Sequence, residues 1–121
     1  MRKALVIDDS QAVRSLLGSF LETMQFQIAE AGNGREALQR LKTHGPFDLA
    51  LVDIHMPEMN GIDFVQAVRA DRTYNDLPLM MVTTESDKSQ VSKAMQAGAN
   101  EYVMKPFTKQ MIQKKLTLLG L

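Results

Sequence analysis

Side chains able to do chemistry occur directly at the ends of several short aliphatic runs of this 121-residue chain. Asp8 and Asp9 follow the first run, and Asp53 follows the third. Thr83 ends the fourth run, and Lys105 follows the fifth. Three carboxylates brought to one place would resist ionising together unless cations neutralised them. One lysine supplies a single positive charge and a divalent cation would supply two more, so the set predicts a metal site.

The ligand chemistry narrows the choice of metal. Ligands that are all oxygen atoms favour Mg²⁺ or Mn²⁺ over zinc. So few protein ligands imply a metal that keeps several waters, binds weakly and binds more tightly once a phosphate joins it. Each residue alone also has a purely structural explanation: Asp9 and Ser10 suit a helix N-cap, Thr83 suits a strand, and Lys105 alone would be solvated. Their shared position at the ends of aliphatic runs favours a common site instead.

The elements that must position these side chains follow from hydrophobic patterning. The aliphatic runs occupy residues 4–7, 27–31, 49–52, 79–82 and 102–104. The first, third and fourth are nearly continuous, as in strands buried on both faces, whereas the second alternates and suits a sheet edge. Stretches with apolar residues at helical spacing separate the runs, and Gly98 and Gly120 are predicted to end the last two helices.

A strand followed by a helix, repeated five times, defines an α/β fold. Right-handed crossovers produce a parallel sheet with helices on both faces. Ligands bind such sheets outside the carboxyl ends of the strands, near the point where the strand order reverses. The chemically active residues all fall at that edge.

Composition excludes several classes of protein. The chain has no cysteine, which excludes a disulfide scaffold, a thiol nucleophile and a cysteine-ligated metal. Its 14 basic and 14 acidic residues leave no net charge, which argues against bulk electrostatic binding of nucleic acid. No apolar run approaches the roughly 20 residues that span a bilayer, and the run before Asp8 is too short for a secretory signal. We therefore expect one cytoplasmic domain.

The ordered set of residues resembles the receiver domain of bacterial response regulators, of the CheY-like chemotaxis type. The resemblance covers essentially the whole chain and is carried by Asp8-Asp9, the segment 53–61 (DIHMPEMNG), Thr83, Tyr102 and Lys105-Pro106-Phe107. It implies a doubly wound, flavodoxin-like (βα)5 fold whose five strands have the order 2-1-3-4-5. It also implies a single receiver domain over residues 1–121 with no output domain. A receiver excised from a longer response regulator or hybrid kinase is the alternative.

The resemblance also implies roles in two-component phosphorelay signalling. Asp53 is expected to accept a phosphoryl group from a sensor histidine kinase or phosphotransfer protein. Mg²⁺ (or Mn²⁺) would be ligated by Asp9, Asp53 and the main-chain carbonyl of His55, and Asp8 would act mostly through metal-bound water. Lys105 would pair with Asp53 and then with the phosphoryl oxygens. On this interpretation the chain is not an enzyme for other substrates and catalyses only its own phosphorylation and dephosphorylation.

A switch is expected to follow phosphorylation. The Thr83 hydroxyl would move to the phosphoryl group, and the Tyr102 ring would turn into the space that it leaves. This would reshape the surface of the fourth helix, fifth strand and fifth helix, which binds a partner protein in a pathway such as chemotaxis. Candidate contacts there are Val91, Met95, Tyr102, Lys109 and Gln113. We expect no direct nucleic-acid or membrane partner, and a monomer or weak dimer.

Two residues, Thr84 and His55, depart from the commonest family pattern. Thr84 stands where the family has a very small residue, which would narrow access to the phosphoryl group. His55 and Glu85 are predicted to pair across the mouth of the site and to tune the rate of dephosphorylation.

The bond between Lys105 and Pro106 is expected to be cis, because the family uses that bend to aim the lysine.

Three other functions compete with this interpretation. A haloacid-dehalogenase-type phosphatase needs a second aspartate two residues after the nucleophile, where this chain has His55. A flavin-mononucleotide binder needs a Ser/Thr/Gly-rich loop after the first strand, where Asp8 and Asp9 would repel phosphate without a metal. A receiver-like scaffold that has lost phosphorylation would lack an acid, the threonine or the lysine, and none is missing.

Overall fold

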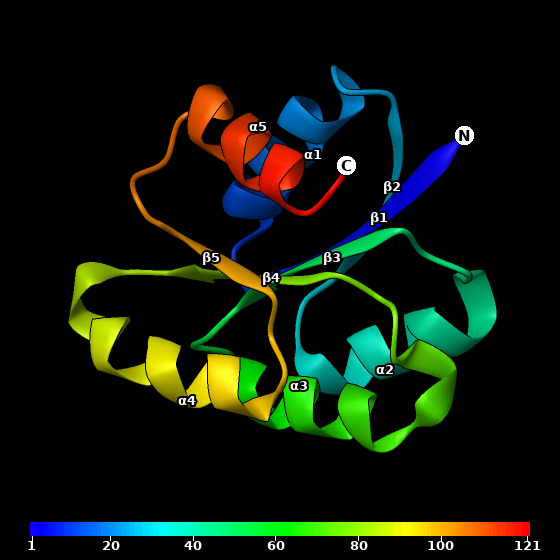
Figure 1. Ribbon diagram of the computed structural model, residues 1–121, viewed down its shortest axis with the longest axis vertical. Helices are drawn as coiled ribbons and strands as arrows, with labels where there is room; N and C mark the ends of the chain where they lie inside the picture. The colour runs from blue at the N-terminus through cyan, green and yellow to red at the C-terminus, as the bar shows by residue number, and fades with distance from the viewer.

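A five-stranded parallel sheet forms the centre of the computed structural model, which describes residues 1–121 (Figure 1). The strands are β1 (Arg2–Ile7), β2 (Phe26–Ala31), β3 (Leu49–Asp53), β4 (Leu79–Thr83) and β5 (Glu101–Met104). Their order, β2-β1-β3-β4-β5, confirms the expected fold class. The alternating second strand lies at an edge, as its pattern predicted.

The helices cover both faces of the sheet. Figure 1 shows α1 (Gln11–Glu22) and α5 (Lys109–Leu118) on one face. The other face carries α2 (Gly34–His44), α3 (Gly61–Ala70) and α4 (Val91–Ala97). Two short 3-10 helices complete the chain, η1 (Arg72–Tyr74) before β4 and η2 (Glu85–Gln90) between β4 and α4.

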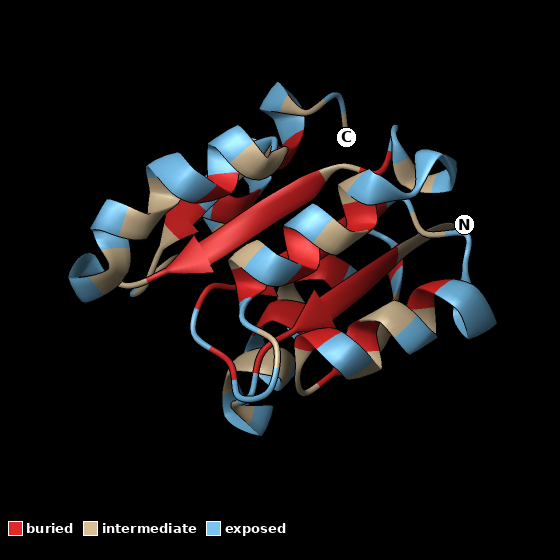
Figure 2. Cartoon of the chain, turned by 90° about the horizontal axis from the view of Figure 1, so that it is seen from below, coloured by how far each residue is buried: buried red, intermediate tan, exposed pale blue.

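Apolar side chains of the central strands form two cores, one under each helical layer. Every residue of β3 and β4 is buried, which is the physical meaning of their continuous apolar runs. Successive side chains alternate between the layers: Leu51 packs in the core beside α1 and α5, whereas Val52 packs in the core beside α2, α3 and α4. Figure 2 shows the buried strands between helices whose outer surfaces are exposed.

Local sequence sets where the helices start and stop. The Ser10 hydroxyl accepts a hydrogen bond from the Val13 amide, so Ser10, and not Asp9, caps α1. Gly98 ends α4 with a φ of 124°, a backbone conformation that favours glycine, as predicted. Gly120, with a φ of 79°, follows α5. No helix combines the length and the apolar character needed to cross a membrane.

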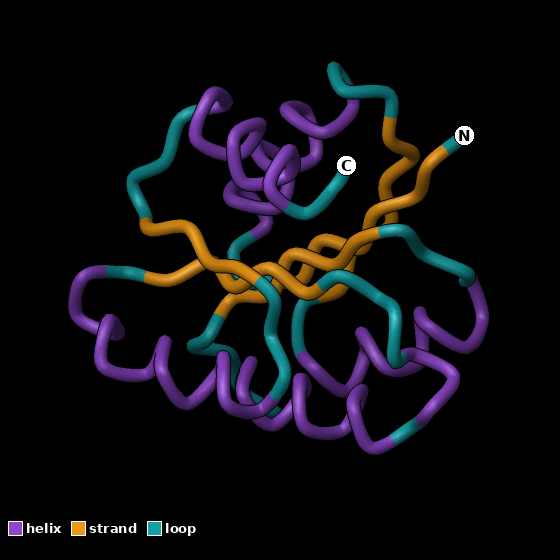
Figure 3. The backbone as a smooth tube through the Cα atoms, in the orientation of Figure 1, coloured by secondary structure: helices purple, strands orange, loops and turns teal.

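The loops that follow the strands gather at one edge of the sheet. In Figure 3 the loops after β4 and β5 lie on the left, at the carboxyl ends of those strands. The peptide bond between Lys105 and Pro106 in the loop after β5 is cis, as predicted. A second cis bond, between Gly45 and Pro46 after α2, was not anticipated.

Candidate functional site

Three aspartates meet at the carboxyl edge of the sheet. β1 and β3 are neighbours in register, with Ile7 opposite Val52, so the residues that follow, Asp8 and Asp53, are brought together. One carboxylate oxygen from each of Asp8, Asp9 and Asp53 lies within 4.8 Å of the other two. Asp8 and Asp53 are buried, while Asp9 is exposed. The predicted convergence of the three acids is confirmed.

Lys105 reaches this cluster from the loop that follows the edge strand β5. Its Nζ lies 3.1 Å from Asp8 Oδ2 and 3.6 Å from Asp53 Oδ1. The shorter contact is therefore to Asp8, although Asp53 was the expected partner. Asp8 Oδ1 also accepts a hydrogen bond of 2.9 Å from the Ser10 amide, so both of its oxygens are bound.

One lysine does not compensate three acids. Burial and the negative charge of Asp8 raise the pKa of Asp53 to about 6, and Asp9 adds to this effect. The charge of Lys105 and a hydrogen bond from the His55 amide lower this pKa by less. The Asp53 carboxylate is therefore buried and its charge is only partly compensated. The surrounding ligand atoms are all oxygens, a donor set that fits Mg²⁺.

Thr83 lies buried beside the cluster at the end of β4. Its hydroxyl donates a hydrogen bond of 3.3 Å to the carbonyl oxygen of Thr84. The Thr84 hydroxyl in turn hydrogen-bonds with Ser86 Oγ at 2.9 Å and with Asp87 Oδ2 at 3.1 Å. The two threonines thus belong to a hydrogen-bonded loop that turns at once into η2.

His55 pairs with Asp87, so the predicted partner, Glu85, was wrong. His55 Nε2 lies 3.0 Å from Asp87 Oδ1. The reason is the tight turn of η2: the Asp87 amide donates to the Thr84 carbonyl, which carries the Asp87 side chain back over the loop. The Thr-x-x-Asp spacing from Thr84 to Asp87 is typical of a helix start and was the sequence signal for this turn, but it does not identify His55 as the partner.

Tyr102 lies on β5 with its side chain at the surface, 37% exposed. The Lys115 ammonium lies 4.7 Å from the centre of its ring. Of the other predicted partner contacts, Met95 is exposed, whereas Val91 and Lys109 are half-buried. Gln113 is exposed on α5 and lines a different cavity.

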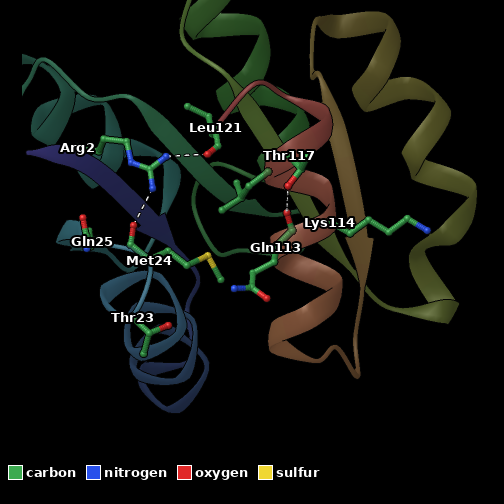
Figure 4. A pocket seen from close by; sticks show the side chains of 9 residues that line it. Arg2, Thr23, Met24, Gln25, Gln113, Lys114, Thr117 and Leu121 are labelled. Carbon is green, nitrogen blue, oxygen red and sulfur yellow. Dashed lines mark hydrogen bonds between the residues drawn. The ribbon is translucent and has the colours of Figure 1, made fainter.

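That cavity is the largest in the structure, about 660 Å³, and it lies at the opposite end of β1 from the aspartates. Figure 4 shows it between the end of α1 and the end of α5. The Arg2 guanidinium is already bound there, donating to the carbonyl oxygens of Met24 and Leu121 at 2.7 and 2.8 Å. The cavity therefore has no part in the chemistry of the acidic cluster.

The chain matches the response regulator receiver domain over residues 4–117, and it belongs to that family. The chemotaxis protein CheY1 of Helicobacter pylori strain J99 is 40% identical over 115 residues, which cover 94% of this chain and 93% of that protein. The fold matches that of chemotaxis response regulator CheY4 of Vibrio cholerae with a TM-score of 0.90, 33% identity and 98% of each chain covered.

A third comparison concerns a ligand complex. The response regulator TrrA of Thermotoga maritima, solved in complex with Mg²⁺ and beryllofluoride, matches with a TM-score of 0.84 and 31% identity. The match covers 98% of this chain and 99% of TrrA. The chain is thus a receiver domain like those of chemotaxis response regulators, a two-component signalling protein and not a conventional enzyme. The family match decides against the phosphatase and flavin alternatives.

Proposed function

We propose that this receiver domain accepts a phosphoryl group on Asp53, in a Mg²⁺-dependent reaction, from a phosphohistidine of a sensor kinase or phosphotransfer protein. The observation that carries the proposal is the buried, under-compensated Asp53 carboxylate beside Asp8, Asp9 and Lys105. The similarity to TrrA with Mg²⁺ and beryllofluoride supports it. The chemotaxis relatives support a chemotaxis pathway in the cytoplasm.

The chain's own residues would act by position and charge. An Asp53 carboxylate oxygen would form the bond to phosphorus while the bond to the histidine nitrogen breaks, leaving its electron pair on nitrogen. Lys105 Nζ, 3.6 Å from Asp53, is placed to face the phosphoryl oxygens. Asp8, Asp9, Asp53 and the His55 main-chain carbonyl would hold Mg²⁺, which would neutralise charge on the transferring group.

The switch would begin at Thr83. A phosphoryl group on Asp53 brings about two negative charges and strong hydrogen-bond acceptors. The Thr83 hydroxyl, which donates a 3.3 Å bond to Thr84, would exchange this partner for a phosphoryl oxygen. The Tyr102 ring would then turn inward and change the surface formed by α4, β5 and α5, where a downstream protein binds. This change is a population shift between two conformations.

Phosphorylation is tested by incubating the protein with Mg²⁺ and acetyl phosphate and measuring its mass. The wild-type protein is expected to gain one phosphoryl group, and EDTA is expected to prevent this. Asp53→Asn should abolish the gain completely, because the nucleophilic oxygen is lost. Asp48→Asn is a matched control, since Asp48 directly precedes the same strand at its other end. A modified Asp53→Asn variant, or an unmodified wild type, would contradict the proposal.

The contact between His55 and Asp87 is expected to lengthen the lifetime of the phosphorylated state. It links the loop that follows β3 to the loop that follows β4. The water that hydrolyses the phosphoryl group would have to pass beside these loops. Replacing Asp87 by alanine should shorten that lifetime about fivefold, which corresponds to about 1 kcal/mol in the barrier. The measurement is the decay of phosphorylated protein after acetyl phosphate is removed. Glu85→Ala is the comparison, and an equal effect of both variants would rule out the His55 pair as the cause.

A further inference from the structure

The side chain of Tyr102 is held by a cation from the neighbouring helix. Lys115 lies on α5, and its ammonium lies 4.7 Å from the centre of the Tyr102 ring. At this distance the negative face of an aromatic ring attracts a cation. Lys115 is only partly exposed, so the contact is less screened by water than one at a fully exposed site.

Glu101 fixes the lysine in this position. Its Oε1 accepts a hydrogen bond of 2.9 Å from Lys115 Nζ and another of 3.0 Å from the Tyr102 amide. Partial burial by itself raises the pKa of Glu101, but the bonds from Lys115 and Tyr102, together with the lysine charge, bring this pKa below its usual value. Glu101 is therefore ionised at neutral pH, and one carboxylate joins the lysine to the backbone of Tyr102.

We infer that Lys115, held by Glu101, is a positioning residue that keeps the Tyr102 ring outward and so opposes the activating switch. The inference rests on the proposed function, because it assigns a restraint to the same switch. It concerns residues outside the acidic cluster.

The direction of the effect follows from linkage. A contact made in only one of two conformations favours that conformation by its own free energy. The ring would leave Lys115 on turning inward, so the lysine favours the resting state. Removing the charge should therefore shift the population toward the inward ring. For a cation–aromatic contact at a partly exposed site, we expect the ratio of inward to outward rings to rise roughly two- to fivefold.

The neighbouring lysine supplies a matched control. Lys114 and Lys115 both line an apolar groove of about 310 Å³ between β5 and α5, together with Tyr102 and Met111. Only Lys115 contacts the Tyr102 ring and Glu101. The variants Lys114→Met and Lys115→Met thus remove the same charge and keep a similar apolar stem, but only the second removes the restraint.

The experiment measures the affinity for beryllofluoride in the presence of Mg²⁺ by calorimetry, and the Tyr102 ring resonances by NMR. Lys115→Met should bind beryllofluoride about two- to fivefold more tightly than wild type, and Lys114→Met should not differ from wild type. Glu101→Gln should shift the affinity in the same direction as Lys115→Met. In the ligand-free Lys115→Met protein, the Tyr102 resonances should move toward their positions in the beryllofluoride complex.

The outcomes separate the two proposals. Failure of wild type to bind beryllofluoride would overturn the proposed function, while the Tyr102 ring resonances of ligand-free Lys115→Met, compared with those of ligand-free wild type and Lys114→Met, would still show whether Lys115 sets the position of the ring. Wild-type binding with unchanged or weaker affinity in Lys115→Met would overturn the restraint alone. A purely structural role would lower the free energy of unfolding of Lys115→Met without moving either readout, and this too would overturn the inference.

Discussion

Replacing Asp53 by asparagine is expected to stabilise the metal-free protein at neutral pH, although it should abolish the proposed phosphorylation. Burial and the neighbouring aspartates raise the pKa of Asp53 from 3.8 to about 6. Each pKa unit of such a difference corresponds to about 1.4 kcal/mol, so the ionised carboxylate destabilises the folded state by at most about 3 kcal/mol, a value that solvent screening reduces. Asparagine has the shape of aspartate without its charge, and so removes this destabilisation.

The sign of the pH dependence is opposite to that of an ordinary salt-bridged aspartate. Between pH 3.8 and about 6 the folded state binds the Asp53 proton more tightly than the unfolded chain does. The destabilisation by Asp53 is therefore absent in more acidic solution, grows as pH rises through this window and is complete above it. The difference in free energy of unfolding between Asp53→Asn and wild type should therefore grow over the same pH range and stay constant above it.

Urea unfolding of both proteins in EDTA, at a series of pH values, measures this effect. Asp76→Asn, at an exposed aspartate remote from the cluster in sequence, is the control and should change the free energy of unfolding by less than about 0.5 kcal/mol. Millimolar Mg²⁺ should narrow the difference, because a ligand of the folded state stabilises wild type by mass action. Equal stability of wild type and Asp53→Asn at neutral pH would contradict the electrostatic account.

Replacing Gly61 by alanine is expected to damage both the fold and the site. Gly61 begins α3 and packs against the end of β3, where its amide donates a 2.9 Å hydrogen bond to the Ile54 carbonyl. An added Cβ would overlap the carbonyl oxygen of Asp53 and lie 2.9 Å from Ile54 Cα. Backbone atoms cannot turn aside as a flexible side chain can. We expect the free energy of unfolding to fall by about 3 kcal/mol, at the upper end of the range for overpacked sites.

Gly18→Ala is the matched control for this substitution. Gly18 lies inside α1, and its added Cβ would make an ordinary contact of 3.5 Å with Ile28. Because alanine favours a helix by about 1 kcal/mol over glycine, this variant should be as stable as wild type or more so. Unfolding experiments and the rate of phosphorylation by acetyl phosphate test both proteins. A Gly61→Ala protein that matched Gly18→Ala in both measurements would show that no such close approach exists.

The strands and the acidic cluster were predictable because their determinants are local. Burial on both faces requires continuous apolar runs, and these runs marked β1, β3 and β4. Parallel strands place their carboxyl ends at one edge, so Asp8 and Asp53 could be assigned to the same edge of the sheet without coordinates. The strand order was not accessible in this way, since alternation of strands and helices fits several orders; it came from the family resemblance.

The partners of individual side chains were decided by the tertiary structure. Lys105 binds Asp8 more closely than Asp53, across 97 positions of the chain, because the course of the loop after β5 sets where its Nζ falls. Asp87, and not Glu85, meets His55 because a 3-10 turn follows Thr84 directly.

Sequence by itself therefore determined which residues occupy the carboxyl edge of the sheet and what chemistry they can do, because hydrophobic periodicity and residue type are properties of the chain. The restraint of Lys115 on Tyr102 exists only once α5 packs beside β5, as do the hydrogen bonds of the acidic cluster. Contacts of a few ångströms between distant segments depend on strand register and loop path, which the whole fold decides together.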